Sequence, residues 1–461
     1  MKELTLKQIA DWCGGTVAPE YETVPVTGVE SDSRKVEVGD LFVALRGERV
    51  DGHDFIPSAK TLGAVAALVS RPSEELPCVV VESPLRAYGE IAKHYREMTG
   101  VKVVGITGSV GKTTTKEMIA SVLSRDFKLY KSEGNHNNEI GLPMTVMNMP
   151  EDTELLVAEL GTNHPGEIAY LSAIAQPDYA VITNIGIAHI EYLGSREGIL
   201  REKLDILRSS LKNTVGIFNG DEPLLWDKRE SLGCKVVTYG IENSACDLTA
   251  DLHSDGTFDI VNNGLAAAHL PVGEKFTAKL SIPGKHNVLN ALAAAAIGLL
   301  LGETPELIAQ GLVSYQASGM RQNIYEQDGY QIYADCYNAS PDAMEATLSV
   351  LGGMAGEGRR FAVLGSMLEL GDYAEEGHRR AGRAAAQYAD VLYAYGPDAA
   401  AMVAGAREKG MEHAYAFDDQ TALVAALRED AKKGDALLFK GSRGMRMERA
   451  LAMFLGEEVE A

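Results

Sequence analysis

A lysine and two threonines follow a glycine-containing turn at residues 108–114, which read Gly-Ser-Val-Gly-Lys-Thr-Thr. Glycines let backbone N–H groups approach phosphate oxygens, and a helix that begins here adds a positive field. Lys112 could then reach the β- and γ-phosphates of a nucleotide, and a threonine hydroxyl could bind Mg²⁺. Ile106 replaces the first glycine of the strict phosphate-loop pattern, so a glycine-rich turn with an incidental lysine is the alternative. We predict that the ATP-binding residues include Gly108, Ser109, Val110, Gly111, Lys112, Thr113 and Thr114.

Two further side chains of chemical interest follow apolar runs that are typical of buried strands. Glu159 comes at the end of LLVAEL, and His189 follows YAVITNIGIA. Residues at the carboxyl ends of strands in an open α/β sheet lie near the expected ligand crevice. Mg²⁺ prefers oxygen ligands, so Glu159 fits, whereas a histidine is an unusual ligand for this metal. Taken alone, each is more often a surface or core-edge residue.

The elements that must position these residues fall into three regions. Residues 1–99 hold short strands and turns, and a helix over 87–99 closes the unit. Residues 100–317 hold continuous apolar runs that suit a parallel sheet covered by helices, and an alanine-rich helix over 287–301 that should stop at Gly302. Residues 318–461 alternate strands with helices, which indicates a doubly wound domain. We predict three α/β domains with these boundaries.

Bulk composition narrows the class of protein. The chain has 461 residues, of which 46% are hydrophobic and 23% charged, as in ordinary soluble proteins. The formal net charge of −22 argues against a broad nucleic-acid-binding surface. No apolar run is long enough for a membrane span, and the N-terminus lacks a signal-peptide core. The five cysteines are scattered without a metal-binding spacing. We expect a cytoplasmic monomer with no nucleic-acid or membrane partner.

A series of motifs runs in one order along most of the chain. The phosphate loop is followed by GNHNNEIGLP (134–143), ELGTNHPGEI (159–168) and TNIGIAHIEYLGS (183–195). IPGKHNVLNALAAAA, GMRQ, ADCYNASPDAM, LGSMLELGDYAEEGH and KGSRGMRME then complete the series. This ordered set resembles the Mur ligase family, whose phosphate loop also lacks the first glycine. An ordered set of this kind is far more specific than any one of its motifs.

The resemblance implies an ATP-dependent ligase that activates a carboxylate as an acyl phosphate, which an amine then attacks. It implies catalytic roles for Lys112, Glu159, His189 and Lys203. The family carbamylates the lysine at the position of Lys203, and Lys212 is an inferior candidate. The implied Mg²⁺ ligands are Thr113, Glu159, His189 and the Lys203 carbamate. For ATP, the resemblance adds Asn287, its neighbour His286, and Arg321, Asp335, Tyr337 and Asn338 from the third region.

The resemblance also implies a site for a UDP-linked muramoyl peptide. SDSRKVEVGDLFVALRGERVDGHDFI (31–56) is similar to the N-terminal motif of the family. Arginine suits bidentate recognition of a diphosphate. The implied residues are Ser31, Ser33, Arg34, Gly47, Arg49 and His53 in the N-terminal region, and Asn137, Asn138, Thr162, Asn163 and His164 in the central one. Without the resemblance, residues 31–56 would be interpreted as a solvated loop.

Motif details favour one branch of the family. GTNHPGEI and LGSMLELGD resemble the branch that adds D-alanyl-D-alanine to a UDP-muramoyl tripeptide, and the Asp-Asn-Pro-Arg signature of the diamino-acid-adding branch is absent. Glu369 and Leu370 could contact the dipeptide, and Lys440, Ser442 and Arg443 could hold a carboxylate. A sibling ligase that adds the third stem residue is one alternative. A phosphate-loop switch or motor is the other, although it leaves Glu159, His189 and Lys203 without a role.

Overall fold

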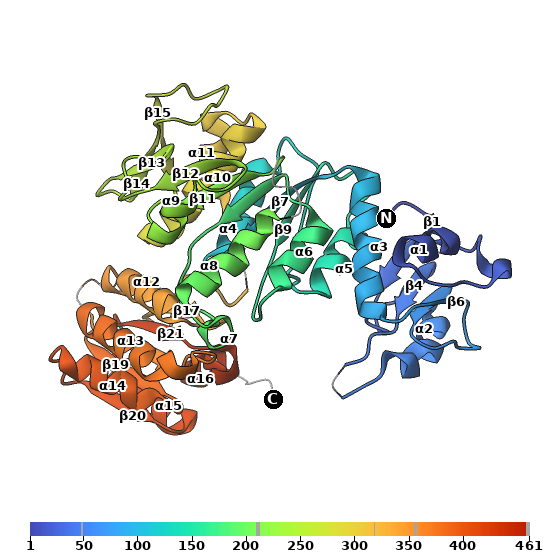
Figure 1. Cartoon of the computed structure of the whole chain (residues 1–461). Coiled ribbons are helices and arrows are strands. Elements are labelled where there is room, and N and C mark those ends of the chain that lie inside the picture. Colours follow the sequence, from blue (N-terminus) through green and yellow to red (C-terminus); the bar gives the residue numbers. More distant parts are fainter. Residues whose placement is uncertain (48, 209–212, 318, 355, 357, 458–461) are drawn as a thin grey trace.

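The computed structural model describes residues 1–47, 49–208, 213–317, 319–354, 356 and 358–457. Lys212 and Ser318, which figured in the sequence interpretation, lie outside the described residues. Three α/β units follow one another along the chain; in Figure 1 the N-terminal unit lies to the right of the central unit and the C-terminal unit lies at its lower left. This arrangement confirms the predicted fold class.

The N-terminal unit is built on a small parallel sheet. Its strands lie in the order β3-β4-β5-β6, and β1 and β2 form a separate antiparallel pair. The strands are β1 (Leu4–Thr5), β2 (Pro25–Val26), β3 (Gly28–Glu30), β4 (Asp40–Val43), β5 (Ala66–Val69) and β6 (Cys78–Val80). The helices are α1 (Leu6–Cys13), α2 (Ile56–Leu62) and two 3₁₀ turns, η1 (Pro19–Tyr21) and η2 (Gly52–Phe55).

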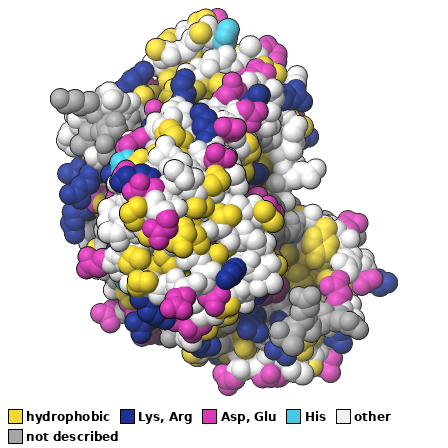
Figure 2. All heavy atoms as spheres, turned by 90° about the vertical axis from the view of Figure 1, so that its right-hand side faces the viewer, with side chains coloured by type: hydrophobic (Ala, Val, Ile, Leu, Met, Phe, Trp, Pro, Cys, Tyr) yellow, Lys and Arg dark blue, Asp and Glu magenta, His cyan; other side chains and the backbone are white. Residues whose placement is uncertain are grey.

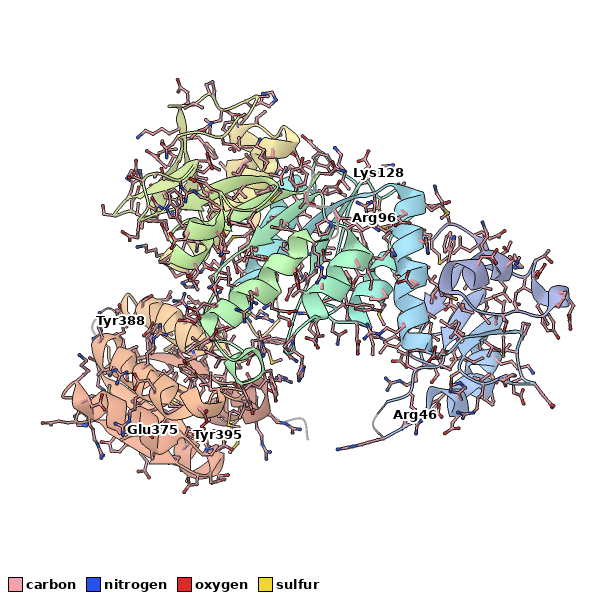
Figure 3. The ribbon with its side chains drawn as sticks, viewed as in Figure 1. Arg46, Arg96, Lys128, Glu375, Tyr388 and Tyr395 are labelled. Atoms are coloured by element: carbon pink, nitrogen blue, oxygen red, sulfur yellow. The ribbon has the colours of Figure 1, made fainter. Side chains whose placement is uncertain are left out.

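Helix α3 (Pro84–Thr99) joins the N-terminal unit to the central one. Ser83 caps its start by accepting from Arg86 N, and Gly100 ends it in the left-handed conformation. The side chains of Tyr88, Ile91 and Tyr95 are fully buried. At its far end Arg96 donates to Ala175 O at 3.2 Å and to Gln176 O at 3.0 Å, so this labelled side chain ties α3 to the central unit (Figure 3).

The central unit has one nine-stranded sheet in the order β15-β14-β13-β12-β11-β10-β7-β9-β8. Strands β8 to β13 and β7 run parallel, which confirms a mainly parallel sheet; β14 and β15 add an antiparallel extension that the sequence analysis did not predict. The strands are β7 (Lys102–Thr107), β8 (Leu129–Lys131), β9 (Leu155–Glu159), β10 (Tyr179–Ile182), β11 (Val215–Asn219), β12 (Lys235–Gly240), β13 (Leu248–Leu252), β14 (Thr257–Asn262) and β15 (Lys275–Lys279).

Helices cover both faces of this sheet. Successive residues of a strand point to opposite faces, so apolar neighbours in one strand are buried in two different hydrophobic cores. Val103 of β7 contributes to one hydrophobic core and Val104 to the other. One face packs on α4 (Lys112–Leu123), α10 (Lys285–Leu301) and α11 (Pro305–Ser314), and the other on α5 (Gly141–Asn148), α6 (Glu167–Ala175) and α8 (Arg196–Leu204). Gly302 caps α10 in the left-handed region, which confirms the predicted stop. The shorter helices are α7 (Ile190–Leu193), η3 (Asp205–Leu207) and α9 (Pro223–Lys228).

The C-terminal unit has a six-stranded sheet in the order β16-β17-β21-β18-β19-β20. Helices α12 to α14 lie over one face and α15 and α16 over the other, as the predicted doubly wound domain requires. Among the strands described for this sheet, only β16 runs antiparallel, and it was not predicted from the sequence. The strands are β16 (Asn323–Gln327), β17 (Tyr330–Asp335), β18 (Arg360–Gly365), β19 (Val391–Tyr395), β20 (Ala414–Phe417) and β21 (Ala436–Lys440). The helices are α12 (Pro341–Gly352), η4 (Gly371–Tyr373), α13 (Ala374–Tyr388), α14 (Ala399–Glu408), α15 (Gln420–Asp430), η5 (Arg443–Met445) and α16 (Met447–Leu455).

Candidate active site

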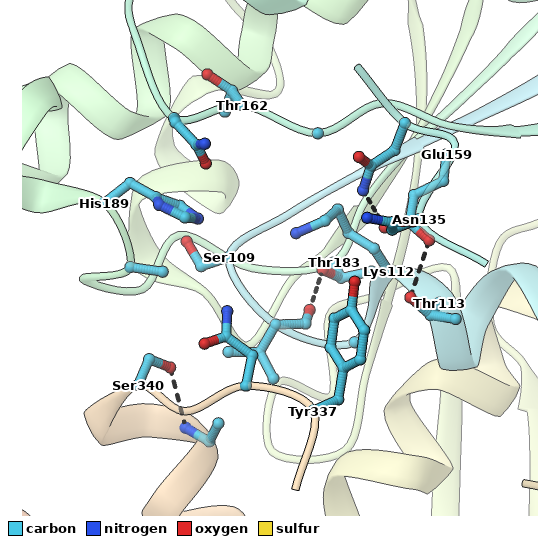
Figure 4. Close-up of a pocket in the computed structure, with 18 of the residues that line it drawn as sticks. Ser109, Lys112, Thr113, Asn135, Glu159, Thr162, Thr183, His189, Tyr337 and Ser340 are labelled. Carbon is cyan, nitrogen blue, oxygen red and sulfur yellow. Dashed lines mark hydrogen bonds between the residues drawn. The ribbon is translucent and has the colours of Figure 1, made fainter. Parts of the chain in front are cut away.

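A cavity of about 800 Å³ lies between the central and C-terminal units (Figure 4). Its described wall combines strand ends and loops of the central sheet with residues of the C-terminal sheet, and these segments lie far apart in sequence. The predicted residues that line it are Ser109, Val110, Gly111, Lys112, Thr113, Thr114, Asn137, Asn138, Glu159, Thr162, Asn163, His189, His286, Arg321, Asp335, Tyr337, Asn338, Glu369, Leu370, Lys440, Ser442 and Arg443.

The phosphate loop connects the end of β7 to the start of α4. Gly108 and Gly111 have φ of 151° and 86°, and a side chain at Gly108 would overlap Thr183 Oγ1. Asn184 shapes the loop, since its Oδ1 accepts from Ser109 N at 3.0 Å and from Val110 N at 2.9 Å. The glycines are therefore required by conformation and by space.

Lys112 begins α4 and reaches back over the loop, where its Nζ donates to Gly108 O at 2.8 Å. Burial lowers the pKa of its ammonium, Glu159 opposes that shift, and the positive charge of Arg321 adds to it. The side chain points into the cavity in Figure 4. A cation at the mouth of the loop is placed to meet phosphate oxygens.

Glu159 ends β9, the strand that pairs with β7, and its carboxylate is buried beside the loop. Thr113 Oγ1 donates to Glu159 Oε2 at 2.9 Å, and Asn137 Nδ2 donates to Oε1 at 2.9 Å. Among the described residues, no group of three or more His, Cys, Asp or Glu side chains could hold a metal ion. A hydroxyl and one carboxylate beside a phosphate loop nevertheless fit Mg²⁺, which binds few protein groups together with substrate phosphates.

His189 lies at the start of α7 and adopts the left-handed conformation with φ of 60°. Its Nδ1 lies 2.5 Å from Glu369 Oε2, a contact between the central and C-terminal units. Burial lowers the pKa of the ring first, the charges of Lys112 and Lys203 lower it further, and Glu369 opposes them. The imidazole and both lysines therefore lie within electrostatic reach of one another.

Lys203 lies in α8 and is 2% exposed. Its pKa is lowered well below the usual value, first by burial and then by the charge of Lys112, while Glu202 opposes the shift. Lys203 does not belong to the described lining of the cavity. A buried lysine with a lowered pKa is more often neutral, and the neutral amine is the form that can capture CO₂.

The C-terminal unit supplies a second wall. The Arg321 guanidinium lies 3.7 Å from the centroid of the Tyr337 ring. Asp335 accepts from Lys440 Nζ at 2.5 Å and from Thr347 Oγ1 at 3.2 Å. Asn287 does not line the cavity: it is buried, and its Nδ2 donates to Pro283 O and to Gln322 Oε1, both at 2.7 Å.

The predicted residues of the N-terminal unit are not brought to this cavity. Ser31, Ser33, Arg34, Gly47 and Arg49 do not belong to its described lining. Arg34 forms two hydrogen bonds with Asp32, at 2.9 Å and 2.8 Å, which lower the pKa of that carboxyl to about 2. Arg46, which follows β4, is labelled in Figure 3 at the edge of the N-terminal unit. The His53 ring lies inside the unit, bonded to Asp51 at 2.6 Å and to Ser70 N at 3.0 Å.

Two further residues, His164 and Asn184, show where the prediction from sequence and the structure differ. His164 was expected with Thr162 and Asn163, but its ring lies outside the described lining and 4.5 Å from the Tyr192 ring. Asn184, which supports the phosphate loop, was not predicted. Its position at the end of β10, directly beside β7, is a topological signal that could have indicated it.

Comparison with known proteins agrees with this geometry. Three family models match consecutive parts of the chain: "Mur ligase family, catalytic domain" at 25–108, "Mur ligase middle domain" at 106–298 and "Mur ligase, glutamate ligase domain" at 320–443. The UDP-N-acetylmuramoyl-tripeptide–D-alanyl-D-alanine ligase of Bacillus subtilis is 41% identical over 457 residues, with 97% of each chain covered. The chain belongs to the Mur ligase family.

Other Mur ligases extend the likeness to three dimensions. The Escherichia coli protein of the same name is 36% identical, with 98% of each chain covered. The crystal structure of MurF from Acinetobacter baumannii superposes with a TM-score of 0.89 at 32% identity and covers 99% of this chain and all of that one. MurF from Thermotoga maritima, solved in complex with ADP, has a TM-score of 0.82 at 33% identity, with 94% and 98% covered.

The distribution of charged side chains on the surface of this Mur ligase agrees with the excess of acidic residues in its sequence. On the face shown in Figure 2, Lys and Arg side chains are interspersed with Asp and Glu rather than gathered into one basic field. In the parts of the chain that the structure describes, no helix combines the length and apolar character needed to cross a bilayer.

Proposed function

We propose that this chain is the ATP-dependent ligase that joins D-alanyl-D-alanine to UDP-N-acetylmuramoyl-tripeptide and releases ADP and phosphate. The names of the curated relatives support this substrate pair. The observation that carries the assignment is the convergence of Lys112, Glu159 and His189 on one cavity, with Lys203 close behind. A phosphate loop alone would serve any nucleotide-dependent protein, whereas this set suits activation of a carboxylate.

The first step joins two anions. A carboxylate oxygen of the tripeptide attacks the γ-phosphorus of ATP, the bond to the β–γ bridging oxygen breaks, and ADP leaves. Lys112 lies at the phosphate loop and would stabilise the charge on the transferred group. Mg²⁺, when bound through Thr113, Glu159, His189 and carbamylated Lys203, would screen the repulsion between carboxylate and phosphate.

The second step forms the amide bond. The dipeptide amine attacks the carbonyl carbon of the acyl phosphate, a tetrahedral intermediate forms, and phosphate leaves as the amine loses its proton. The acyl phosphate must be kept from water, and the C-terminal unit, which carries Arg321 and Asp335, would close over it. The loop with Leu368, Glu369 and Leu370 lines the same cavity and is the site that we assign to the dipeptide.

We assign the UDP end of the substrate to the N-terminal unit. Ser31, Ser33, Arg34, Gly47 and Arg49 would contact the uridine and diphosphate, and Asn137, Asn138, Thr162, Asn163 and His164 the sugar and peptide. Asn287 would support the adenine site from behind, through its bond to Gln322. The reaction would take place in the cytoplasm, where ATP and UDP-linked precursors are available, and the enzyme would act as a monomer.

One assay tests the assignment against its alternatives. Phosphate release is measured with UDP-muramoyl tripeptide, D-alanyl-D-alanine, both together, and the amino acids that a sibling ligase would add to a UDP-muramoyl dipeptide. Release that requires tripeptide and D-alanyl-D-alanine together supports the proposal. Release without either substrate would favour a nucleotide-driven switch. With ¹⁸O in the tripeptide carboxylate, label in the released phosphate is expected; its absence from phosphate would rule out the acyl phosphate.

A further inference from the structure

The loop at residues 366–370 contributes to the cavity wall from the C-terminal unit. It joins β18 to η4, and Leu368, Glu369 and Leu370 all line the cavity. Glu369 has φ of 64°, an uncommon conformation for a residue with a side chain, and its carboxylate meets His189 Nδ1 at 2.5 Å. The surroundings must hold this backbone, because such a conformation is costly by itself.

The backbone of this loop is anchored by side chains at two consecutive amides. Met367 N donates to His378 Nε2 at 2.8 Å, and Leu368 N donates to Ser442 Oγ at 2.9 Å. His378 lies in α13 directly beneath the loop and has no exposed surface. Its neighbour Gly377 lies so close to Leu370 that an added Cβ would be 3.0 Å from Leu370 Cδ1.

The imidazole of His378 is bonded at both nitrogens, which fixes its tautomer. Since Nε2 accepts from Met367 N, the proton must be on Nδ1, which donates to Ala374 O at 2.6 Å. Burial lowers the pKa of the ring and favours this neutral form, although Ala374 O and Asp398 oppose the shift. Asp398 Oδ2 lies 3.7 Å from Nε2. The side chain therefore links the first turn of α13 to the loop.

We infer that His378 is a positioning residue for the acceptor dipeptide: it holds Leu368, Glu369 and Leu370 in the conformation that binds D-alanyl-D-alanine. This inference rests on the proposed function. His378 does not line the cavity, so it acts on the dipeptide only through the loop. Removal of the acceptor would leave Met367 N–H buried without its partner, and the loop would change conformation to satisfy it.

Two amide substitutions separate the two bonds of the ring. The amide of His378→Asn reaches about as far as Nδ1, so it can keep the bond to Ala374 O but loses the acceptor for Met367 N. His378→Gln is one methylene longer and can still accept from Met367 N. Tyr393→Phe is the matched control, because it removes a buried hydroxyl from the same domain on the opposite face of the sheet.

The readout is the separation of three KM values in steady-state phosphate release. For H378N we expect KM for D-alanyl-D-alanine to rise at least about tenfold, while KM for ATP and for the UDP-tripeptide stays within about twofold. H378Q and Y393F should keep all three values near those of the wild type. The melting temperatures of H378N and H378Q are measured first, and all KM values are determined below the lower of the two.

Hydrogen exchange provides a measurement that does not depend on turnover. Backbone amides of 366–370 should exchange faster in H378N than in the wild type and in H378Q. Equal KM values for the dipeptide in H378N and the wild type would overturn the inference, and so would a rise shared by all three substrates. A wild-type enzyme that is inactive with the tripeptide and dipeptide would overturn the proposed function, and the inference with it.

Discussion

Lys112 and Lys203 place the same residue type in two different environments at this site. Both are buried and both have lowered pKa values, and the charge of Lys112 contributes to the shift at Lys203. Lys112 points into the cavity, where bound phosphates would restore a favourable environment for its charge. Lys203 lies behind the described wall, where a charged ammonium is disfavoured and a neutral amine can react with CO₂.

Lys112→Ala should reduce phosphate release at least about a thousandfold, because the γ-phosphate loses its cation in the transition state while the loop backbone persists. Steady-state release with all three substrates measures the loss. Lys128→Ala is the control, since Lys128 pairs with Asp152 on the surface and lies away from the cavity (Figure 3). Near-full activity in the Lys112 variant would exclude the phosphate-loop assignment.

Lys203→Ala should lose most activity, and Lys203→Arg should not restore it, because arginine keeps a positive charge where the proposed metal site requires an anionic oxygen ligand. Lys203→Glu should retain a little, and short carboxylic acids should partly rescue the alanine variant. NMR with ¹³C-labelled bicarbonate should show a carbamate signal in the wild type that is missing from the variants. A fully active alanine variant without such a signal in the wild type would discard the carbamate.

The site residues that could be predicted from the sequence are those that stand at a recognisable place in a motif. Lys112 follows two glycines, and Glu159 follows an apolar strand, so their place at a strand end was visible. Asn184 and His378 were not predicted, because their importance lies in which backbone amides they accept from. Asn287 illustrates the reverse case: it is at the predicted helix start, but the structure turns it toward Gln322 rather than the cavity.

At the scale of elements, α4 carries the phosphate loop and is fixed by close contact with two helices behind it. A Cβ at Gly311 of α11 would lie 2.5 Å from Val122 Cα of α4. Thr115 of α4 donates to Asn290 of α10 at 3.1 Å. The orientation of the loop therefore depends on helix packing as well as on its own glycines.

Gly311→Ala should destabilise the central unit by about 1–3 kcal/mol, because the added methyl overlaps the backbone of α4, which cannot move without moving the loop. Thermal unfolding followed by circular dichroism measures the effect. Gly233→Ala is the matched control, since an added Cβ there meets nothing within 4 Å. Equal melting temperatures for both variants would show that α4 and α11 can separate at little cost.

Helices and strands with a clear hydrophobic pattern were predictable from the sequence, and strands at the edges of the sheets were not. The alternation of strands and helices over 330–456 is clear in the sequence because each buried strand is a continuous apolar run. Strands β14 to β16 escaped prediction, since their exposed positions mix polar residues into the run and their antiparallel pairing is set by tertiary contact. The exact domain boundaries stay predictions.

At the scale of the molecule, the cavity depends on how the C-terminal unit meets the central one. Asp342 of α12 accepts from Ile187 N at 3.1 Å, and Glu369 contacts His189. Arg321 is close enough to Lys112 to influence its pKa. Nucleotide binding and domain closure should therefore be linked.

Arg321→Ala should raise KM for ATP by about tenfold or more and leave binding of the UDP-tripeptide unchanged, because we assign the guanidinium to the nucleotide side of the cavity. Steady-state kinetics and calorimetric titration of the UDP-substrate measure the two effects. Arg383→Ala is the control, since Arg383 forms surface ion pairs with Glu376 and Glu408 in the same domain. Weaker UDP-substrate binding with unchanged ATP kinetics would contradict the domain assignment.

Helix α3 packs in one hydrophobic core together with the N-terminal and central units, and this has a consequence for how the molecule unfolds. One hydrophobic cluster contains residues of the N-terminal unit, such as Leu6 and Val43, together with Val146 and Leu171 of the central unit. The two clusters of the C-terminal unit contain buried residues from that unit alone. Units that share a core lose their structure cooperatively, whereas a unit with its own core can melt independently. A calorimetric scan should therefore resolve two heat-absorption transitions for this three-domain chain, with residues 1–99 melting together with the central unit.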